Sequence, residues 1–438
     1  MDQSKEMMLP MYRDMVKIRQ FEERAADLFV QGKLPGFIHV YVGQEAVAVG
    51  TCTNLRGDDA ITSTHRGHGH VIAKGGDVRL MFSELYGKST GYCKGKGGSQ
   101  HIADIDSGIL GANGIVGGGL PIAVGAAFAA KQGQRGQVVV CFFEDIGVHG
   151  GNFGVTRQLV EEFGEERVRD TPISEIAIVG SAVGAAMTGL RPVVEIMFAG
   201  FIGCCFDALY MKLGMWRQVH GNIPLPVVVR APMGGAGGAG LEHAYCPESL
   251  LIHSPGLKVL VPATPYDAKG LLKTAIRGED PCVYLEHIAL YTKRGPEGDA
   301  DTLVPFGKAE VRREGKDATI VTYSAMVYKA MEAAEKLAQE GIECEVIDLR
   351  TLVPLDEEAI YESVKKTGRL VVVHEAMERG GVAGEIMAKV MENAFDYLDA
   401  PVKRVGALNV PNLGGAMESV CLPQTENIVE AVRSLVRG

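Results

Sequence analysis

The sequence contains no block of basic residues, no Cys-x-x-Cys pair and no apolar run at its start. The formal net charge is −10, and without a basic stripe we expect no nucleic-acid partner. The nine cysteines are scattered, with none at zinc-ligand spacing, which favours buried free thiols in a reducing compartment. Acidic side chains lie among the first ten residues, so we expect no signal peptide and a cytoplasmic protein.

The longest uncharged stretch, residues 107–130, has enough residues to cross a membrane. It is interrupted by repeated glycines and by Pro121, which are typical of a loop and not of a continuous span. We therefore predict a loop that enters a buried helix, and no membrane partner.

The chain has 438 residues, of which 46% are hydrophobic, enough for two or three domains with their own cores. Helical periodicity is clear over about 11–29, and 137–145 is typical of a buried parallel strand that ends in acids. Further alternation of strands and helices follows to about 287, then a polar linker at 292–302 and a second α/β region. The pattern predicts an α/β fold class.

Four places along the chain could carry chemistry. The first is Thr64–His70, just after a predicted strand, where three histidines could ligate a metal. The interleaved glycines instead favour a loop whose backbone approaches a ligand, and the planar fork of Arg66 suits a phosphate. A solvated turn is the alternative, and for any single histidine here it explains the pattern about as well.

The second place is the glycine-rich loop 114–119, which opens a helix and could present amides to an anion or a flat ring. Tight packing of a helix on a sheet would give the same composition. The third place is Glu175, before a helix with almost no polar residue. Capping of that helix by Ser174, with Glu175 as an ordinary first-turn acid, is the favoured interpretation. The alternative is a lone carboxylate whose pKa burial would raise.

The fourth place is the glycine-rich stretch 233–243, which ends in His243. Substrate access and a disordered surface loop explain its composition equally well. Taken together, the four places suit a ligand with a diphosphate, an aromatic ring and a need for a carboxylate that gains and loses a proton. Thiamine diphosphate has these properties.

Long motifs extend this interpretation to the whole chain. Residues 9–143 resemble the front of the α subunit of the decarboxylating component of 2-oxo acid and acetoin dehydrogenases, through STHRGHGH, YGKSTGYCKGKGGSQHIAD and GANGIVGGG. Residues 144–438 resemble the β subunit, through EDIGVHGGNFGVTRQLVEEFGEERVRDTPISE and PGLKVLVPATPYDAKGLLKTAIR. The resemblance implies transketolase-like, thiamine-diphosphate-binding parallel-sheet domains and a transketolase C-terminal-like α/β domain. Their expected ranges are 1–143 for a partial α-type diphosphate-binding domain, 144–300 for a β-type pyrimidine-binding domain, and 301–438.

The resemblance also implies roles for individual residues. Glu175 matches the glutamate that hydrogen-bonds N1′ of the aminopyrimidine, while His243 and His68 match active-site histidines. The residues that match cofactor contacts are Arg66 and His65 at the diphosphate, and Gly114, Val116, Gly117, Ile173 and Phe201 along the aminopyrimidine.

The metal site departs from the family pattern. In α subunits the corresponding strand runs into Gly-Asp-Gly, which holds the Mg²⁺ that bridges the diphosphate, whereas here it runs into Glu144-Asp145-Ile146-Gly147. Asp145 remains a candidate metal ligand. Because Mg²⁺ screens the charge of the diphosphate, an incomplete cage predicts weak thiamine diphosphate binding or none.

The implied activity is oxidative decarboxylation of a pyruvate-like 2-oxo acid, or cleavage of acetoin, with acyl transfer to a lipoyl group. The implied partners are a lipoyl-bearing acyltransferase, the small 2-oxo acid or acetoin, and further copies of the chain in a homo-oligomer. A non-catalytic hybrid subunit with an incomplete cofactor site stays open as an alternative. A transketolase-like transferase also stays open, although DTPISE and PGLKVLVPATPYDAKGLL favour the dehydrogenase branch.

Overall fold

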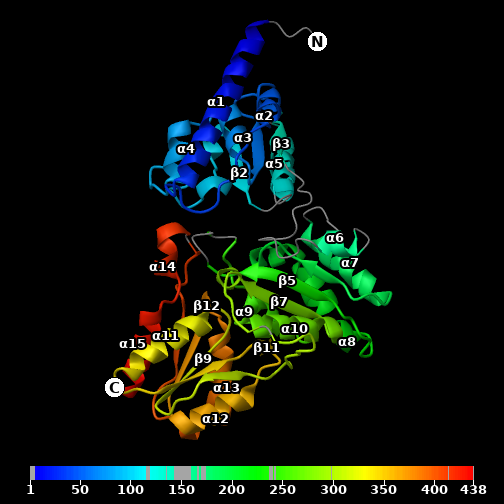
Figure 1. Cartoon of the computed structure of the whole chain (residues 1–438). Helices are drawn as coiled ribbons and strands as arrows, with labels where there is room; N and C mark the ends of the chain where they lie inside the picture. Colours follow the sequence, from blue (N-terminus) through cyan, green and yellow to red (C-terminus); the bar gives the residue numbers. More distant parts are fainter. Residues whose placement is uncertain are drawn as a thin grey trace. The chain divides into compact units, whose positions relative to one another are not determined.

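The computed structural model describes residues 5–114, 119–134, 136–142, 159–164, 167–168, 174–235, 240, 243–296, 298–412 and 414–437. The chain divides into two compact units, Met1–Gly147 and Val148–Gly438. Each unit is drawn in Figure 1 and is described by itself.

The first unit is a small parallel sheet covered by helices. Its strands lie in the order β2-β1-β3, and β1 pairs in parallel with both neighbours. The apolar stripe of the first helix packs into the core through Ile18, Phe21 and Ala25, so the predicted opening helix is confirmed and begins earlier than expected. The elements are α1 (Lys5–Val30), α2 (Glu45–Cys52), β1 (Ala60–Thr64), α3 (His68–Ala73), α4 (Val78–Leu85), η1 (Gly98–Gln100), η2 (Ile105–Ser107), β2 (Ile109–Asn113), α5 (Gly119–Gln132) and β3 (Val139–Cys141).

The second unit contains two five-stranded sheets. The first has the order β11-β6-β7-β5-β4, with β11 as its antiparallel edge. The apolar helix predicted at Glu175 is confirmed as α7. The elements around this sheet are α6 (Leu159–Phe163), α7 (Glu175–Met187), β4 (Val193–Glu195), η4 (Ala199–Cys205), η5 (Ala208–Leu213), α8 (Trp216–Val219), β5 (Val228–Met233), α9 (Glu248–Ile252), β6 (Lys258–Leu260), α10 (Pro265–Arg277), β7 (Cys282–His287) and η6 (Ile288–Leu290).

The second sheet has the order β13-β12-β9-β10-β8, with β8 antiparallel to the rest. Helices α11 and α15 pack together on one face, and α12 and α13 cover the other (Figure 1). The elements are β8 (Glu310–Arg313), β9 (Ala318–Thr322), α11 (Met326–Ala338), β10 (Cys344–Asp348), β11 (Thr351–Val353), α12 (Glu357–Thr367), β12 (Leu370–Met377), α13 (Val382–Asn393), η7 (Phe395–Tyr397), β13 (Lys403–Ala407), η8 (Gly415–Met417), α14 (Glu418–Cys421) and α15 (Thr425–Val436).

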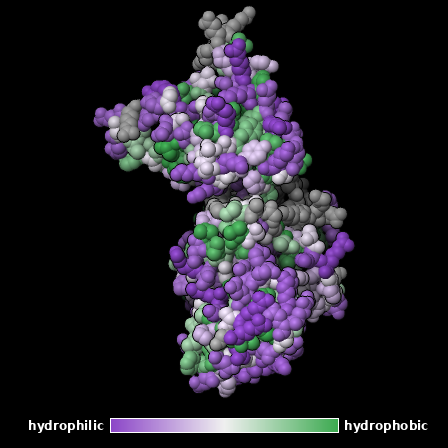
Figure 2. Space-filling view, turned by 90° about the vertical axis from the view of Figure 1, so that its left-hand side faces the viewer, coloured by the Kyte–Doolittle hydropathy of each residue, from purple (hydrophilic) through white to green (hydrophobic). Residues whose placement is uncertain are grey.

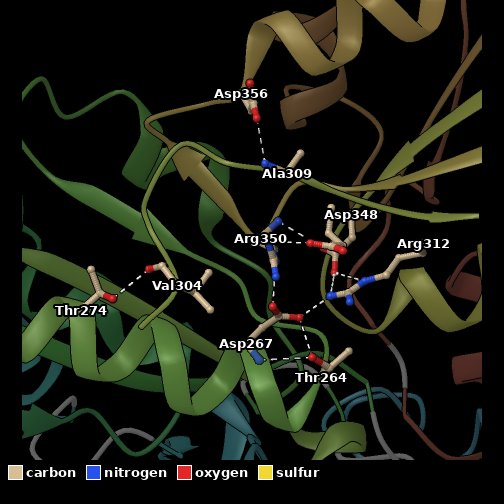
Figure 3. A network of polar contacts seen from close by, with 10 residues as sticks. Thr264, Asp267, Thr274, Val304, Ala309, Arg312, Asp348, Arg350 and Asp356 are labelled. Atoms are coloured by element: carbon tan, nitrogen blue, oxygen red, sulfur yellow. Dashed lines mark hydrogen bonds and ion pairs between the residues drawn. The ribbon is translucent and has the colours of Figure 1, made fainter. Parts of the chain in front are cut away.

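The two sheets of the second unit are joined by a buried ion-pair network (Figure 3). Asp267, in the first turn of α10, accepts from Arg350 Nε at 2.7 Å, from Thr264 Oγ1 at 2.5 Å and from Arg312. Arg312 also donates to Asp348 at 2.7 Å, and burial raises the pKa of Asp348 to about 6 although Arg312 opposes that shift. Since β11 follows Arg350 and pairs with β6, the network and the added strand fix one sheet to the other.

The described residues of the stretch 107–130 include strand β2 and most of helix α5, and no helix in the described ranges is long and apolar enough to cross a bilayer. The expectation that this helix is buried is wrong. Ile122, Val124 and Phe128 of α5 are exposed, because the described part of the small sheet covers only one side of the helix. All nine cysteines are free, as predicted.

Candidate functional site

The predicted histidine cluster follows β1 and is buried. His68 is 0% exposed, its Nδ1 lies 3.0 Å from Glu22 Oε2, and its Nε2 lies 2.9 Å from Ser99 Oγ. The solvated-turn alternative is therefore wrong for this residue. Both ring nitrogens are engaged within the first unit, so the structure shows His68 as part of a buried polar chain, and its catalytic role stays a prediction.

His70 belongs to the same buried cluster. Its ring nitrogens lie 2.7 Å from Ser63 Oγ and 2.9 Å from Tyr41 Oη, and its ring stacks on Phe142 with centroids 3.7 Å apart. Burial lowers the pKa of His70 to about 3, so the ring is neutral at physiological pH. A side chain at Gly69 would come within 2.1 Å of the Tyr41 ring, which explains the glycine between the two histidines.

Arg66 and Gly114 lie at the same edge of the small sheet. Thr64 pairs in register with Asn113, so the residues that follow these two strands are neighbours at the carboxyl ends. Parallel sheets bind ligands at this edge. Arg66 is half-buried and its Nη1 donates to the Val40 carbonyl at 3.0 Å. His65 is buried and contacts the ring of His39 edge-on, with centroids 5.0 Å apart.

Glu84 is a buried residue that the sequence did not single out. Its carboxylate accepts four backbone N–H groups at 2.8–3.1 Å, from Cys93, Gly95, Gly97 and Gly98. These contacts shape the loop that leads to Ser99, which in turn holds His68. The signal in the sequence was an acid at the end of a helix followed by the glycine-rich run GYCKGKGG.

Glu175 begins α7 in the second unit and is 6% exposed. Burial raises the pKa of its carboxyl group. Ser174 makes no side-chain hydrogen bond to the helix, so the favoured capping interpretation is wrong. The remaining interpretation is a buried carboxylate that favours its protonated form more than a free glutamate does.

Three aromatic rings, which we call the aromatic group, lie together near α7: Phe198, Phe201 and His243. The ring of His243 contacts Phe198 and Phe201 edge-on, with centroid separations of 4.4 Å and 5.8 Å. Phe201 belongs to η4, which packs on α7. The structure thus brings Phe201 and His243 together, and places Glu175 on the neighbouring helix.

A second ion-pair network, also absent from the sequence predictions, lies among β4, β5 and β7. Arg230 donates to both oxygens of Glu286, at 2.6 and 2.8 Å, and to Glu195 at 3.1 Å, while Tyr291 donates to Glu286 at 2.6 Å. Although burial opposes it, the pKa of Arg230 is raised because Glu286 and Glu195 stabilise the cation. Glu195 ends β4, the strand that leads to Phe198, so this network fixes the approach to the aromatic group.

The metal prediction falls outside what the structure describes. Val116, Gly117, Asp145 and Ile173 lie outside the described residues. Among the residues with described positions, no group of three His, Cys, Asp or Glu side chains could hold a metal ion. Glu175 and the aromatic rings beside α7 have the chemistry that a pyrimidine ring requires, and the guanidinium of Arg66 suits a phosphate, but their roles toward a cofactor stay predictions.

Comparison with known families covers nearly the whole chain. Residues 13–159 match the dehydrogenase E1 component, 122–293 match the pyrimidine binding domain of transketolase, and 307–428 match the transketolase C-terminal domain. The pyruvate dehydrogenase E1 component subunit beta of Staphylococcus aureus is 45% identical over 302 residues, which are 68% of this chain and 93% of the relative. The chain belongs to this E1 family. It joins an α-type front to a β-type rear, as the motifs predicted.

Other relatives agree with this E1 assignment. The corresponding subunit of Staphylococcus epidermidis is 44% identical over 303 residues, 69% of this chain and 93% of that subunit. Among solved structures, a split-gene transketolase in an inactive β4 tetramer matches with a TM-score of 0.53 and 25% identity, over 65% of this chain and 89% of that one. The transketolase-like α/β fold is thereby confirmed, and domains of this kind indicate thiamine diphosphate as the cofactor.

Proposed function

We propose that this E1 chain catalyses thiamine-diphosphate-dependent oxidative decarboxylation of a pyruvate-like 2-oxo acid, or cleavage of acetoin, and passes the acyl group to a lipoyl-bearing acyltransferase. The observation that carries the proposal is Glu175, buried at the start of an apolar helix with a raised pKa beside an element that bears Phe201. A carboxyl group with a raised pKa keeps its proton to higher pH than a free glutamate does, which suits proton exchange with a ring nitrogen.

Bound thiamine diphosphate would supply the carbon nucleophile and the electron sink for decarboxylation. Glu175 would hold and move the proton at N1′ of the pyrimidine. Phe201 would offer the ring an apolar face, and His243, packed against Phe198 and Phe201, would present a ring nitrogen to the substrate carbonyl. In the first unit, Arg66 would bind the diphosphate with His65 and the backbone from Gly114 to Gly117.

The expected domains are 1–143, 144–300 and 301–438. In this proposal the cofactor lies between residues 1–143 of one copy and residues 144–300 of another, with 301–438 supporting the pairing. His68 would act through the buried chain formed by Glu22 and Ser99.

The proposed activity can be tested by dye reduction with the purified full chain, using pyruvate, 2-oxo-isovalerate and acetoin as substrates. The assay needs thiamine diphosphate and Mg²⁺ at millimolar concentration, because the metal-binding sequence is incomplete. We expect turnover with at least one substrate that depends on added cofactor. No cofactor-dependent turnover with any of them would favour the non-catalytic hybrid subunit.

Thiamine diphosphate is expected to bind weakly. Glu144-Asp145-Ile146-Gly147 replaces Gly-Asp-Gly, and the described residues offer no metal cluster to compensate. Without full Mg²⁺ coordination the charge of the diphosphate is poorly screened. Isothermal titration with Mg²⁺ should therefore give a dissociation constant well above the micromolar range, whereas micromolar binding near one site per chain would contradict an incomplete site.

The chain is expected to form a homo-oligomer through exposed apolar surfaces. On α7 and just beyond it, Ile176, Met187 and Leu190 are exposed, although the helix contains almost no polar residue. A second apolar surface lies around α14, and Figure 2 shows hydrophobic residues gathered there on the second unit. Its exposed members are Leu408, Val410, Met417 and Val420. Exposed apolar surface of this kind typically marks an interface.

Met187→Lys should weaken this association, because a lysine on α7 would have to lose its hydration at the interface. Met391→Lys is the matched control, since Met391 is a similarly exposed methionine on α13 (47% against 58% for Met187). Sedimentation velocity should show a smaller species for Met187→Lys alone. Identical sedimentation of the two variants would place the interface elsewhere.

A further inference from the structure

A buried histidine–glutamate pair connects the two sheets of the second unit at the base of the glycine-rich stretch. Glu375 lies in β12 and His287 ends β7, and His287 Nε2 lies 2.9 Å from Glu375 Oε2. His287 Nδ1 accepts the backbone N–H of Ala289 at 3.2 Å. That nitrogen is therefore unprotonated, so Nε2 carries the hydrogen and donates it to the carboxylate.

The other oxygen of Glu375 accepts from one residue inside the glycine-rich stretch 233–243 and from one residue that follows it. The backbone N–H of Gly235 donates to Oε1 at 2.6 Å, and the thiol of Cys246 donates to the same oxygen at 4.0 Å. Burial raises the pKa of Cys246 well above its usual value, so the thiol keeps its proton. Burial alone would raise the pKa of Glu375, but His287, the Gly235 N–H and Lys329 hold it below the ordinary value, so the acceptor is ionised.

At positions 234 and 235 the surrounding side chains leave no room for a Cβ atom, so glycine is required. Gly234 has a φ of +86°, and a Cβ there would lie 2.0 Å from His287 Nε2. A Cβ on Gly235 would lie 2.3 Å from Leu422 Cδ1. The backbone therefore lies directly against the histidine, and these two positions are fixed contacts.

We propose that Glu375, oriented by His287, is a positioning residue that fixes Gly235 and Cys246 and thereby holds His243 against Phe198 and Phe201. His243 lies three residues before Cys246, so fixing Cys246 limits where the ring of His243 can lie. Glu375 is more than 100 positions from His243 in the sequence, in the part of the chain that matches the transketolase C-terminal domain. The inference rests on the proposed function only for the task of His243 at the substrate.

The contacts of Glu375 with Gly235 and Cys246, which we call the clamp, can be tested without any catalysis. In Glu375→Ala, hydrogen–deuterium exchange of the peptide that contains Gly235 should become at least tenfold faster in the intact full chain, because its amide loses its acceptor. Glu345→Ala is the matched control, since Glu345 is equally buried, lies in β10 of the same sheet and is paired with Lys366. Unchanged exchange at Gly235 in Glu375→Ala would overturn the proposal.

Two further variants keep the test decisive if Glu375→Ala fails to fold. His287→Gln retains an N–H donor and should keep the slow exchange, whereas His287→Leu removes the donor and should behave as the Glu375 variant does. If exchange at Gly235 stays slow in His287→Leu, then His287 does not orient Glu375, and that part of the proposal is overturned.

The kinetic arm asks whether Glu375 acts through His243. Glu375→Ala should lower kcat about a hundredfold, as a misplaced group does, while thiamine diphosphate affinity stays within about threefold. In a His243→Ala background, the same substitution should cost no further activity, because the residue it positions is already absent. An equal loss in both backgrounds would overturn positioning of His243.

The two arms separate the two proposals. An inactive wild-type chain with fast exchange in Glu375→Ala would defeat the proposed function and leave the clamp standing. An active chain whose kcat is unaffected by Glu375→Ala would defeat the positioning role and leave the proposed function standing.

Discussion

Glu175→Gln is expected to lower kcat for 2-oxo acid decarboxylation by about 10²- to 10⁴-fold, the usual contribution of a positioned acid–base group. Glutamine has nearly the same size but cannot exchange a proton with N1′ of the cofactor. Dye reduction with saturating pyruvate, thiamine diphosphate and Mg²⁺ measures the loss. The value of KM should change much less than kcat, because the side chain acts on the cofactor and not on the substrate.

The same variant should be no less stable than the wild-type chain. Burial raises the pKa of Glu175, so its charged form is disfavoured in the folded state. A carboxyl group with a raised folded pKa costs stability once the pH exceeds its unfolded value, and costs none when both states are protonated. Glu175→Gln should therefore raise the melting temperature at pH 8 relative to wild type, and this gain should vanish near pH 4.

Glu385→Gln provides the control, because Glu385 is also a first-turn acid but is largely exposed on α13. It should change neither kcat nor the pH dependence of melting. A Glu175→Gln chain that keeps more than a tenth of wild-type kcat would remove Glu175 from the proton-transfer role. A loss of kcat accompanied by a lower melting temperature at pH 8 would instead indicate damage to the fold.

Asp267→Ala is expected to lower the free energy of unfolding of the second unit by about 3–5 kcal/mol, the cost of breaking a buried ion pair from one side. Asp267 is fully buried, and its removal takes one carboxylate from both Arg312 and Arg350. Arg312 retains its ion pair with Asp348, and Arg350 retains its ion pair with Glu310, so we expect a loss of stability toward the lower end of this range. Guanidinium titration followed by circular dichroism gives the change in midpoint.

The effect should have a second signature, because the network in Figure 3 joins the two sheets. With Asp267 removed, β11 loses support at its pairing with β6, and the two sheets should unfold at separate midpoints. Glu340→Ala is a suitable control, since Glu340 pairs with Arg433 and Arg437 at the surface and its loss should cost much less. Equal shifts in the two variants would show that the network contributes little to joining the sheets.

Some features could be predicted because they depend on neighbouring residues alone. The helix predicted to begin near Glu175 and the helical periodicity over about 11–29 follow from local pattern and are confirmed by α7 and α1. Glu175 and His243 were identified as candidates from motifs, and in the structure Glu175 is buried and His243 packs against the rings of Phe198 and Phe201.

Other features could not be predicted, because they pair residues far apart in the sequence. Glu84 was missed because its partners are backbone N–H groups, for which the glycine-rich run after α4 is only an indirect signal. In the sequence Arg230 and Glu286 are single charged residues in two strands, and only the pairing of these strands in the sheet brings them into contact. The capping role expected for Ser174 is wrong, because its side chain makes no hydrogen bond to the first turn of α7.

The sequence by itself determined the family, the α/β class and the residue types suited to thiamine diphosphate, since these follow from long motifs and hydrophobic periodicity. Tertiary structure alone decided which side chains lose water and which carboxylates meet which cations. Only folding made Glu175 a buried acid, engaged both nitrogens of His68, and brought Glu375 to Gly235. The physical reason is that desolvation and ion pairing depend on three-dimensional surroundings, which a linear pattern specifies only through the completed fold.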